Sequence, residues 1–260
     1  MKDLMNRPGK YLTILTVVVA AFLFLNFLPI DRPSLRKIAA QPRSVVADPV
    51  SALSLADSPR LNLLYDSLQL DSLGLSTQAY HKAIAGFLSL VATGAVPNPG
   101  ILSIIDFSLP STQKRLFILD TYSGKLLFNS LVAHGRNSGT LVATRFSNRR
   151  NSFMSSLGFY LTGEPFIGQH GYSLRLEGME KGWNDNVFRR SIIMHPAEYV
   201  SEDHIRQWGF LGRSEGCPAI PQQLDRPIID VIRGGSCLFV YSPDKKYLLG
   251  HHPTPLVTKG

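Results

Sequence analysis

The chain has 260 residues, of which 44% are hydrophobic and 18% charged, and its formal net charge is +8. This composition excludes a disordered chain, and the length allows one sizeable domain with appendages or two small domains. The positive charge does not indicate a nucleic-acid partner, because no basic run alternates with aromatic residues and no zinc-finger spacing is present. We interpret it as a contribution to solubility and a weak attraction to anions.

The first feature along the chain is an apolar segment at residues 11–30. Its twenty residues carry no charge and follow Lys2, Arg7 and Lys10. That length matches a bilayer core of about 30 Å, whereas the apolar region of a signal peptide is shorter and ends at a small-residue cleavage site. The only nearby candidate, residues 38–40, is a poor cleavage site. The sequence therefore predicts an uncleaved membrane anchor preceded by a cytoplasmic tail at residues 1–10, with a cleaved signal as the alternative.

A polar tether and a helical region are expected next. Residues 31–60 contain scattered Pro, Ser and Ala without a clear period, which is typical of a tether. From residue 61 onward, leucines and aromatic residues recur at helical spacing. Ser76 is a suitable N-cap for a helix over residues 77–92. We expect a helical extension over residues 61–96 that packs on the following domain; a helical pair that docks a partner is the alternative.

From residue 97 the pattern is that of β-strands. Residues 101–107 are strongly β-prone, and residues 115–119 and 126–132 flank a turn, which predicts a hairpin. Further strands are expected at residues 158–162, 172–176, 191–194 and 237–241, and short helices at residues 202–208 and 228–232. Because no βαβ alternation is visible, we predict a mainly β, mostly antiparallel, sandwich- or barrel-like domain over residues 97–250 with a few short helices. Residues 251–260 form a C-terminal tail.

Two cysteines offer different chemistry. Cys217 follows Gly216 in a turn-forming loop, where a thiol is displayed and backbone N–H groups can face a developing oxyanion. Cys237 begins an apolar strand, where cysteine acts as a small hydrophobic residue. The residue types alone leave three possibilities for Cys217: a nucleophile, half of a disulfide with Cys237, or an inert thiol.

Histidine could activate such a thiol. His195 ends the apolar segment 192–194 and is the favoured base, although a hydrogen-bonded structural histidine is the alternative. His134 and His170 are rivals, because each precedes a glycine and could line a cleft. The three histidines lack the spacing of common zinc sites, so a zinc peptidase remains a minor alternative, and we expect no metal and no cofactor.

These residues together resemble the L,D-transpeptidase catalytic-domain family of bacterial cell-wall enzymes. The family's hallmark is a histidine followed by a Ser-x-Gly-Cys loop, and here Ser214 to Cys217 lie 19 to 22 positions after His195. The resemblance covers residues 61–247, and its other parts are residues 131–139, 156–160, 171–178 and 211–213. Glu215 stands where histidine is commoner, Pro196 where glycine is usual, and Pro218 where a basic residue often follows the cysteine.

The resemblance implies a mechanism. His195 takes the thiol proton, giving a thiolate–imidazolium pair, while the carbonyl of Pro196 holds its other ring nitrogen. Cys217 attacks the carbonyl of the third residue of a peptidoglycan stem tetrapeptide, and D-alanine leaves. The N–H groups of Gly216 and Cys217 stabilise the oxyanion. The resulting thioester passes to an amine, forming a 3–3 cross-link, or to water, which is L,D-carboxypeptidase action.

The resemblance also implies substrate contacts and a location. Ser214, Arg213, His170 and the loop of His134 are expected to line or bind the stem peptide, with Arg213 or that loop holding its carboxylates. The expected partners are peptidoglycan stems and, through residues 11–30, the inner membrane; the protein is expected to be a monomer in the periplasm. A catalytically weak peptidoglycan-binding module of the same fold and a periplasmic thiol protein are the alternatives.

Overall fold

The computed structural model describes residues 53–250. The predicted anchor at residues 11–30, most of the predicted tether and the predicted tail at residues 251–260 lie outside this range. Among the residues that the structure describes, no helix has both the length and the apolar character needed to cross a membrane. The division into tether, helical extension and catalytic domain stays a prediction.

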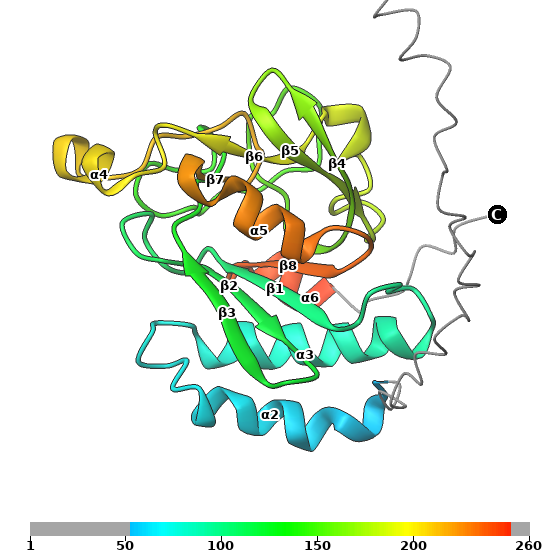
Figure 1. The fold of residues 1–260 in the computed structure, drawn as a ribbon. Helices are drawn as coiled ribbons and strands as arrows, with labels where there is room; N and C mark the ends of the chain where they lie inside the picture. The colour runs from blue at the N-terminus through cyan, green and yellow to red at the C-terminus, as the bar shows by residue number, and fades with distance from the viewer. Residues whose placement is uncertain (1–52, 251–260) are drawn as a thin grey trace, which may run out of the picture. The chain divides into compact units, whose positions relative to one another are not determined.

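Two helices precede the sheet, as the sequence predicts. After a short 3-10 turn, η1 (Leu55–Asp57), come α2 (Ser58–Ser67) and α3 (Thr77–Ala92). Ser76 caps α3 because its Oγ accepts a hydrogen bond from the Ala79 N–H at 3.0 Å. The apolar face of α3 is buried against α2 on one side and against strands of the sheet on the other (Figure 1).

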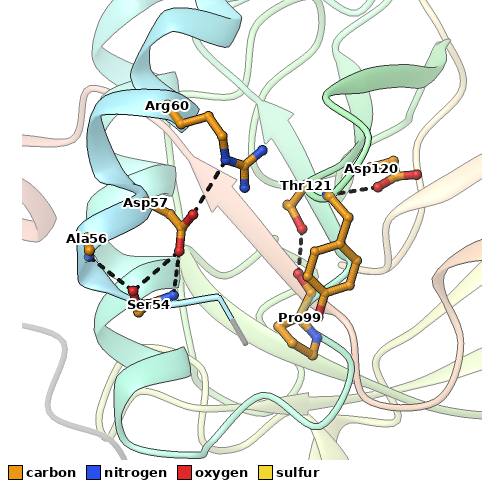
Figure 2. A network of polar contacts seen from close by, with 8 residues as sticks. Ser54, Ala56, Asp57, Arg60, Pro99, Asp120 and Thr121 are labelled. Carbon is orange, nitrogen blue, oxygen red and sulfur yellow. Dashed lines mark hydrogen bonds and ion pairs between the residues drawn. The ribbon is translucent and has the colours of Figure 1, made fainter. Parts of the chain in front are cut away.

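Polar contacts fix the start of α2 and connect the loop before residue 101 to the turn that follows residue 120. Figure 2 shows Asp57 accepting a hydrogen bond from the Ser54 N–H at 2.8 Å and lying 3.5 Å from the Arg60 Nε. In the same view the Thr121 hydroxyl donates to the Pro99 carbonyl oxygen at 2.6 Å. These local bonds use backbone groups that a helix end or a turn would otherwise leave without partners.

The strands form one eight-stranded sheet in the order β3-β2-β1-β8-β4-β5-β6-β7. The β1–β8 and β6–β7 pairs are parallel, and the other pairs are antiparallel. The predicted mainly β, mostly antiparallel class is therefore confirmed, but the two parallel pairs were not predicted. The strands are β1 (Ile101–Asp106), β2 (Leu116–Asp120), β3 (Lys125–Ser130), β4 (Gly158–Gly168), β5 (Gly171–Gly178), β6 (Ile193–Ala197), β7 (Ala219–Pro221) and β8 (Cys237–Tyr241).

The two ends of the sheet meet. Ala133, three residues beyond β3, forms an antiparallel bridge with Ala219 of β7, and Gly135 forms a parallel bridge with Ser214. Since β3 and β7 are the edge strands, these bridges nearly close the sheet on itself and protect its edges. The predicted barrel-like arrangement is confirmed, and the closure places the segment after β3 beside the Cys217 loop.

The remaining helices are short. Helix α5 contributes the fully buried Ile228, Ile229 and Ile232, and it contacts β1, β4 and β5, while α3 contacts β1 and β8. In Figure 1 these two helices cover opposite sides of β1. The short elements are η2 (Phe188–Arg190), α4 (Glu202–Trp208), η3 (Gln222–Leu224), α5 (Asp225–Ile232) and α6 (Lys245–Gly250).

One strand boundary differs from the prediction in a way that matters for the site. The strand expected at residues 191–194 is β6, Ile193–Ala197, so His195 lies within the strand instead of after it. The reason is the neighbour strand: His195, Pro196 and Ala197 pair with the three residues of β7. That parallel pairing joins segments far apart in sequence, which a local pattern does not reveal.

Candidate active site

The Cys217 loop is shaped by Ser214 and Gly216. The Ser214 hydroxyl donates to the Cys217 carbonyl oxygen at 2.6 Å and accepts from the Gly216 N–H at 3.0 Å. Gly216 has φ of +125°, and a Cβ there would lie 2.8 Å from the Met154 carbonyl oxygen, so only glycine suits the turn. The resemblance implies that the Gly216 N–H stabilises an oxyanion, but in the structure this N–H already donates to the Ser214 hydroxyl. The Cys217 N–H makes no backbone hydrogen bond to another residue of the described chain and is the available donor.

Both thiols are free, so the structure has no Cys217–Cys237 disulfide. Cys217 is half-buried, and its Sγ lies 3.8 Å from the Ser191 carbonyl oxygen. Burial raises the pKa of this thiol, and the Ile193 N–H and the positive charge of Arg190 partly oppose that rise. Cys237 is fully buried in β8, where burial raises its pKa more strongly. Of the two thiols, only that of Cys217 is accessible.

His195 presents one ring nitrogen to its own backbone and leaves the other open. Its Nδ1 donates to the Pro196 carbonyl oxygen at 2.9 Å, the contact that the family resemblance implies. This bond fixes the neutral tautomer in which Nε2 carries no proton and can accept one. The residue is buried, and burial lowers its pKa, with the nearby His170 acting in the same direction.

Strand pairing brings the segments that carry His195 and Cys217 side by side. His195 pairs with Ala219, two residues beyond Cys217, and the His195 N–H donates to the Pro218 carbonyl oxygen at 3.4 Å. Among the described residues no hydrogen bond joins the two side chains, because the sulfur faces Ser191. Such catalytic bonds often form only when substrate binds.

His170 covers the His195 ring and borders a cleft. The two rings stack with centroids 4.3 Å apart and planes 25° apart, and His170 itself is exposed at the β4–β5 turn. The cleft has a volume of about 620 Å³, enough for a short peptide. Its lining includes Phe166, His170, Arg175, Phe188, Ile193 and Cys217. His170 is thus where the sequence analysis expected a substrate-lining residue.

His134 is placed differently from the expectation. It is fully buried; its Nδ1 accepts from the Arg115 guanidinium at 2.7 Å, and its Nε2 donates to the Gly139 carbonyl oxygen at 3.1 Å. Burial, helped by the charge of Arg115, lowers the pKa of His134 to about 4. With both nitrogens occupied, the ring cannot bind a ligand. The backbone of His134 instead helps to hold the Cys217 loop, because the His134 carbonyl oxygen accepts a hydrogen bond from the Ser214 N–H at 3.0 Å.

Arg213 and Glu215 lie on the exposed side of the loop. The Arg213 guanidinium lies 3.5 Å from the Gly139 carbonyl oxygen and 3.4 Å from the Thr140 hydroxyl. Glu215, which stands in place of the commoner histidine, forms an exposed ion pair with Arg136 at 3.5 Å. Arg213 remains free to bind a carboxylate, since it forms no ion pair with another residue of the described range.

The sequence analysis missed two arginines near the cleft. Arg175 of β5 lines it and lies over the Phe166 ring at 4.6 Å, and Arg190 ends η2 next to the Cys217 loop. The only sequence signal was the pair of adjacent arginines at 189 and 190. Over residues 53–250 the structure contains no group of three or more His, Cys, Asp or Glu residues that could hold a metal ion, so the zinc-peptidase alternative has no ligand set there.

Comparison with known families identifies the class. The family model of the L,D-transpeptidase catalytic domain matches residues 71–241, and this chain belongs to that family. The match includes every site residue described above. It begins within the helical region, before α3, so part of that region lies inside the family domain.

Similar solved structures share little sequence with the chain. An L,D-transpeptidase from Mycobacterium smegmatis is 12% identical with a TM-score of 0.34; the match covers 55% of this chain and 59% of that one. The cell shape determining protein Pgp2 from Campylobacter jejuni is 14% identical with a TM-score of 0.35, over 56% of this chain and 48% of that one. An L,D-transpeptidase from Xylanimonas cellulosilytica is 13% identical with a TM-score of 0.33; the match covers 70% of this chain and 93% of that one. No curated protein matches the chain. The chain spans less than two thirds of the first two of these structures.

Proposed function

We propose that this protein is a peptidoglycan L,D-transpeptidase that works through a thioester on Cys217. Family membership supports an acyltransferase or peptidase acting on peptidoglycan. The observation that supports the finer proposal is the pairing of β6 with β7, which brings the strand of His195, with its free Nε2, alongside the segment that follows Cys217, whose half-buried thiol lines a cleft.

The first half of the reaction forms the acyl-enzyme. The Cys217 sulfur attacks the carbonyl of the third stem residue as His195 Nε2 takes the thiol proton. The Cys217 N–H stabilises the oxyanion in place of the Gly216 N–H. The carbon–nitrogen bond to D-alanine then breaks, and His195 gives the proton to the leaving amine.

The second half transfers the acyl group. An amine of a neighbouring stem attacks the thioester, His195 accepts a proton from it, and the thiol is regenerated as the 3–3 cross-link forms. Water in place of the amine releases a tripeptide, which is L,D-carboxypeptidase action. The exposed Arg213 and Arg175 are available for the stem carboxylates.

The protonation state at rest follows from the local environment. Burial raises the pKa of Cys217 and lowers that of His195, so both shifts favour the neutral thiol and neutral imidazole. This differs from the thiolate–imidazolium pair expected from the resemblance. Proton transfer therefore accompanies the attack on the substrate, with His195 acting as a general base.

The location remains part of the proposal. Peptidoglycan stems lie outside the cytoplasm, so the catalytic domain acts in the periplasm, held by an anchor at residues 11–30. The catalytically weak binding module is the second candidate for the fold, but the presence of both His195 and Cys217 favours an enzyme.

The test uses the full chain and a synthetic stem tetrapeptide that ends in D-alanine, with and without a second stem that carries a free amine. We expect mass spectrometry to find a tripeptide acyl group on Cys217 and free D-alanine. A cross-linked dimer with the amine present identifies a transpeptidase, and tripeptide alone identifies a carboxypeptidase. Binding of the stem with no acylation and no D-alanine release contradicts the enzyme and supports the binding module.

A further inference from the structure

Arg190 is the residue on which the neighbouring segment 147–156 converges. One guanidinium nitrogen donates to the Ser147 carbonyl oxygen at 2.7 Å and to the Ser156 hydroxyl. The other donates to the Met154 carbonyl oxygen and to the Ser152 hydroxyl, the latter at 3.3 Å. All four acceptors are neutral, and no carboxylate of the described chain forms an ion pair with this guanidinium. Its positive charge is thus held in place without being neutralised.

The same guanidinium lies against the Cys217 loop. A Cβ on Gly216 would sit 3.0 Å from an Arg190 nitrogen and 2.8 Å from the Met154 carbonyl oxygen that this arginine holds. The residue after Arg190 contacts the sulfur itself: the Cys217 thiol donates to the Ser191 carbonyl oxygen at 3.8 Å. Ser191 has φ of +53°, a backbone conformation that is uncommon outside glycine and that turns its carbonyl towards the sulfur.

Among the described residues, two arginines lie near the Cys217 thiol: Arg190, against the Cys217 loop, and Arg175, which lines the same cleft. Arg190 lowers the pKa of Cys217, whereas burial and the negative charge of Glu215 raise it. From β6, His195 is kept neutral by burial and by His170, because its own pKa is lowered. From β4, the buried Tyr160 faces Arg190 as a phenol, since burial raises its pKa. The Arg190 guanidinium, whose charge lowers the pKa of Cys217, is therefore able to balance negative charge on sulfur.

We propose that Arg190 is a positioning residue for the nucleophile, which holds segment 147–156 beneath the Gly216 turn and supplies the permanent positive charge beside the Cys217 sulfur. This goes beyond the proposed function and rests on it only in taking Cys217 as the reactive thiol. His195 moves the proton, and Arg190 stabilises the charge that the proton leaves behind. A purely structural brace would need the hydrogen bonds but not the charge.

The experiment separates charge from hydrogen bonding in the full chain. Arg190→Gln removes the charge and keeps donors, Arg190→Lys keeps the charge and loses the planar fork, and Arg189→Gln removes the charge of the exposed neighbour as a matched control. The readout is the rate at which iodoacetamide alkylates Cys217 between pH 6 and 10, followed by peptide mass spectrometry. This readout needs no stem peptide, so it is independent of whether the protein proves to be a transpeptidase.

We expect Arg190→Gln to move the alkylation profile to higher pH and to slow the reaction at pH 7 by about tenfold, since one pH unit changes the thiolate fraction by that factor. Arg190→Lys should stay within about threefold of the parent while lowering the melting temperature, and Arg189→Gln should match the parent. An unchanged profile in Arg190→Gln overturns the charge role and leaves a brace. If that variant does not fold, Arg190→Lys decides: a profile displaced by a full pH unit in the folded Lys variant overturns the proposal, and a retained profile with a lower melting temperature supports it.

Discussion

His134 and His195 occupy neighbouring parts of the candidate site and differ in how their rings are hydrogen-bonded. Both lie in segments that pair with the Cys217 loop or with β7. His134 has both ring nitrogens hydrogen-bonded, to Arg115 and to Gly139, whereas His195 has one bonded to Pro196 and the other open. The comparison shows that burial alone does not distinguish a structural histidine from one that is able to accept a proton. The unoccupied nitrogen does.

Two arginines near the candidate site also differ in how fully their surroundings are closed to solvent. Arg115 is fully buried beside His134 and donates to the Val132 and Leu109 carbonyl oxygens, and burial lowers its pKa to about 9. Arg190 is half-buried and lies beside the Cys217 loop. Arg115 completes a closed hydrogen-bond network, whereas Arg190 holds its charge next to the loop of the proposed nucleophile.

The largest effect is expected from the nucleophile itself. Cys217→Ser should lower the rate of stem acylation by at least about 10³-fold, because a neutral serine hydroxyl at this site is a far weaker nucleophile. Cys237→Ala, in β8, should stay within a few-fold of the parent and serves as the control. The measurement is D-alanine release from a tetrapeptide stem. Equal loss in both variants would show that the cysteines contribute only to stability.

The histidine comparison is tested next. His195→Ala should lower the acylation rate at pH 7 by about 10²–10⁴-fold, the usual contribution of a general base, and should leave the protein folded. His134→Ala, once its folded fraction is measured by circular dichroism, should acylate much closer to the parent rate. The reverse result, a slow His134→Ala and a fast His195→Ala, means that the catalytic histidine is misassigned.

For His134 the expected effect is on stability. His134→Ala removes the acceptor for one Arg115 donor and the donor to Gly139, so the free energy of unfolding should fall by about 1–3 kcal/mol or more. Urea denaturation at pH 7 measures this change. His81→Ala, on the exposed side of α3, is the matched control and should change the free energy of unfolding by less than about 0.5 kcal/mol. A His134 variant as stable as this control contradicts the structural role.

The same histidine predicts a pH dependence. Between its ordinary pKa of about 6.5 and its folded value of about 4, the unfolded chain binds a proton that the folded protein does not. The stabilising contribution is complete above pH 6.5 and is lost as the pH falls towards 4, by up to roughly 3 kcal/mol. Urea midpoints at pH 7 and pH 4.5 should differ more in the parent than in His134→Gln. The same difference in both proteins would assign the pH dependence to other groups.

The smallest effect is expected at His170. His170→Ala uncovers the His195 ring and removes the electrostatic effect by which His170 lowers the pKa of His195, so both changes should raise that pKa. The acidic limb of the acylation profile should therefore move to higher pH, with less than about a tenfold change in rate at pH 7. His204→Ala, on α4, is the control. An unmoved acidic limb would show that His170 has no influence on the base.

Sequence patterns determined the parts of this protein that depend on neighbours along the chain. The helix over residues 77–92, its cap at Ser76 and the strand over residues 237–241 occur as predicted, because caps and apolar periodicity act within a few residues. The membership in the L,D-transpeptidase family and the order of His195 and Cys217 were likewise visible in the sequence.

Only the tertiary structure decided which polar groups are left free. The parallel β6–β7 pairing and the burial of His134 on Arg115 have no local signature. Arg190 holds Ser147 across 43 positions of sequence, so its role depends on contacts that exist only after the sheet has closed. A residue's type determines which bonds it can make, but packing between distant segments determines which of those bonds are already taken.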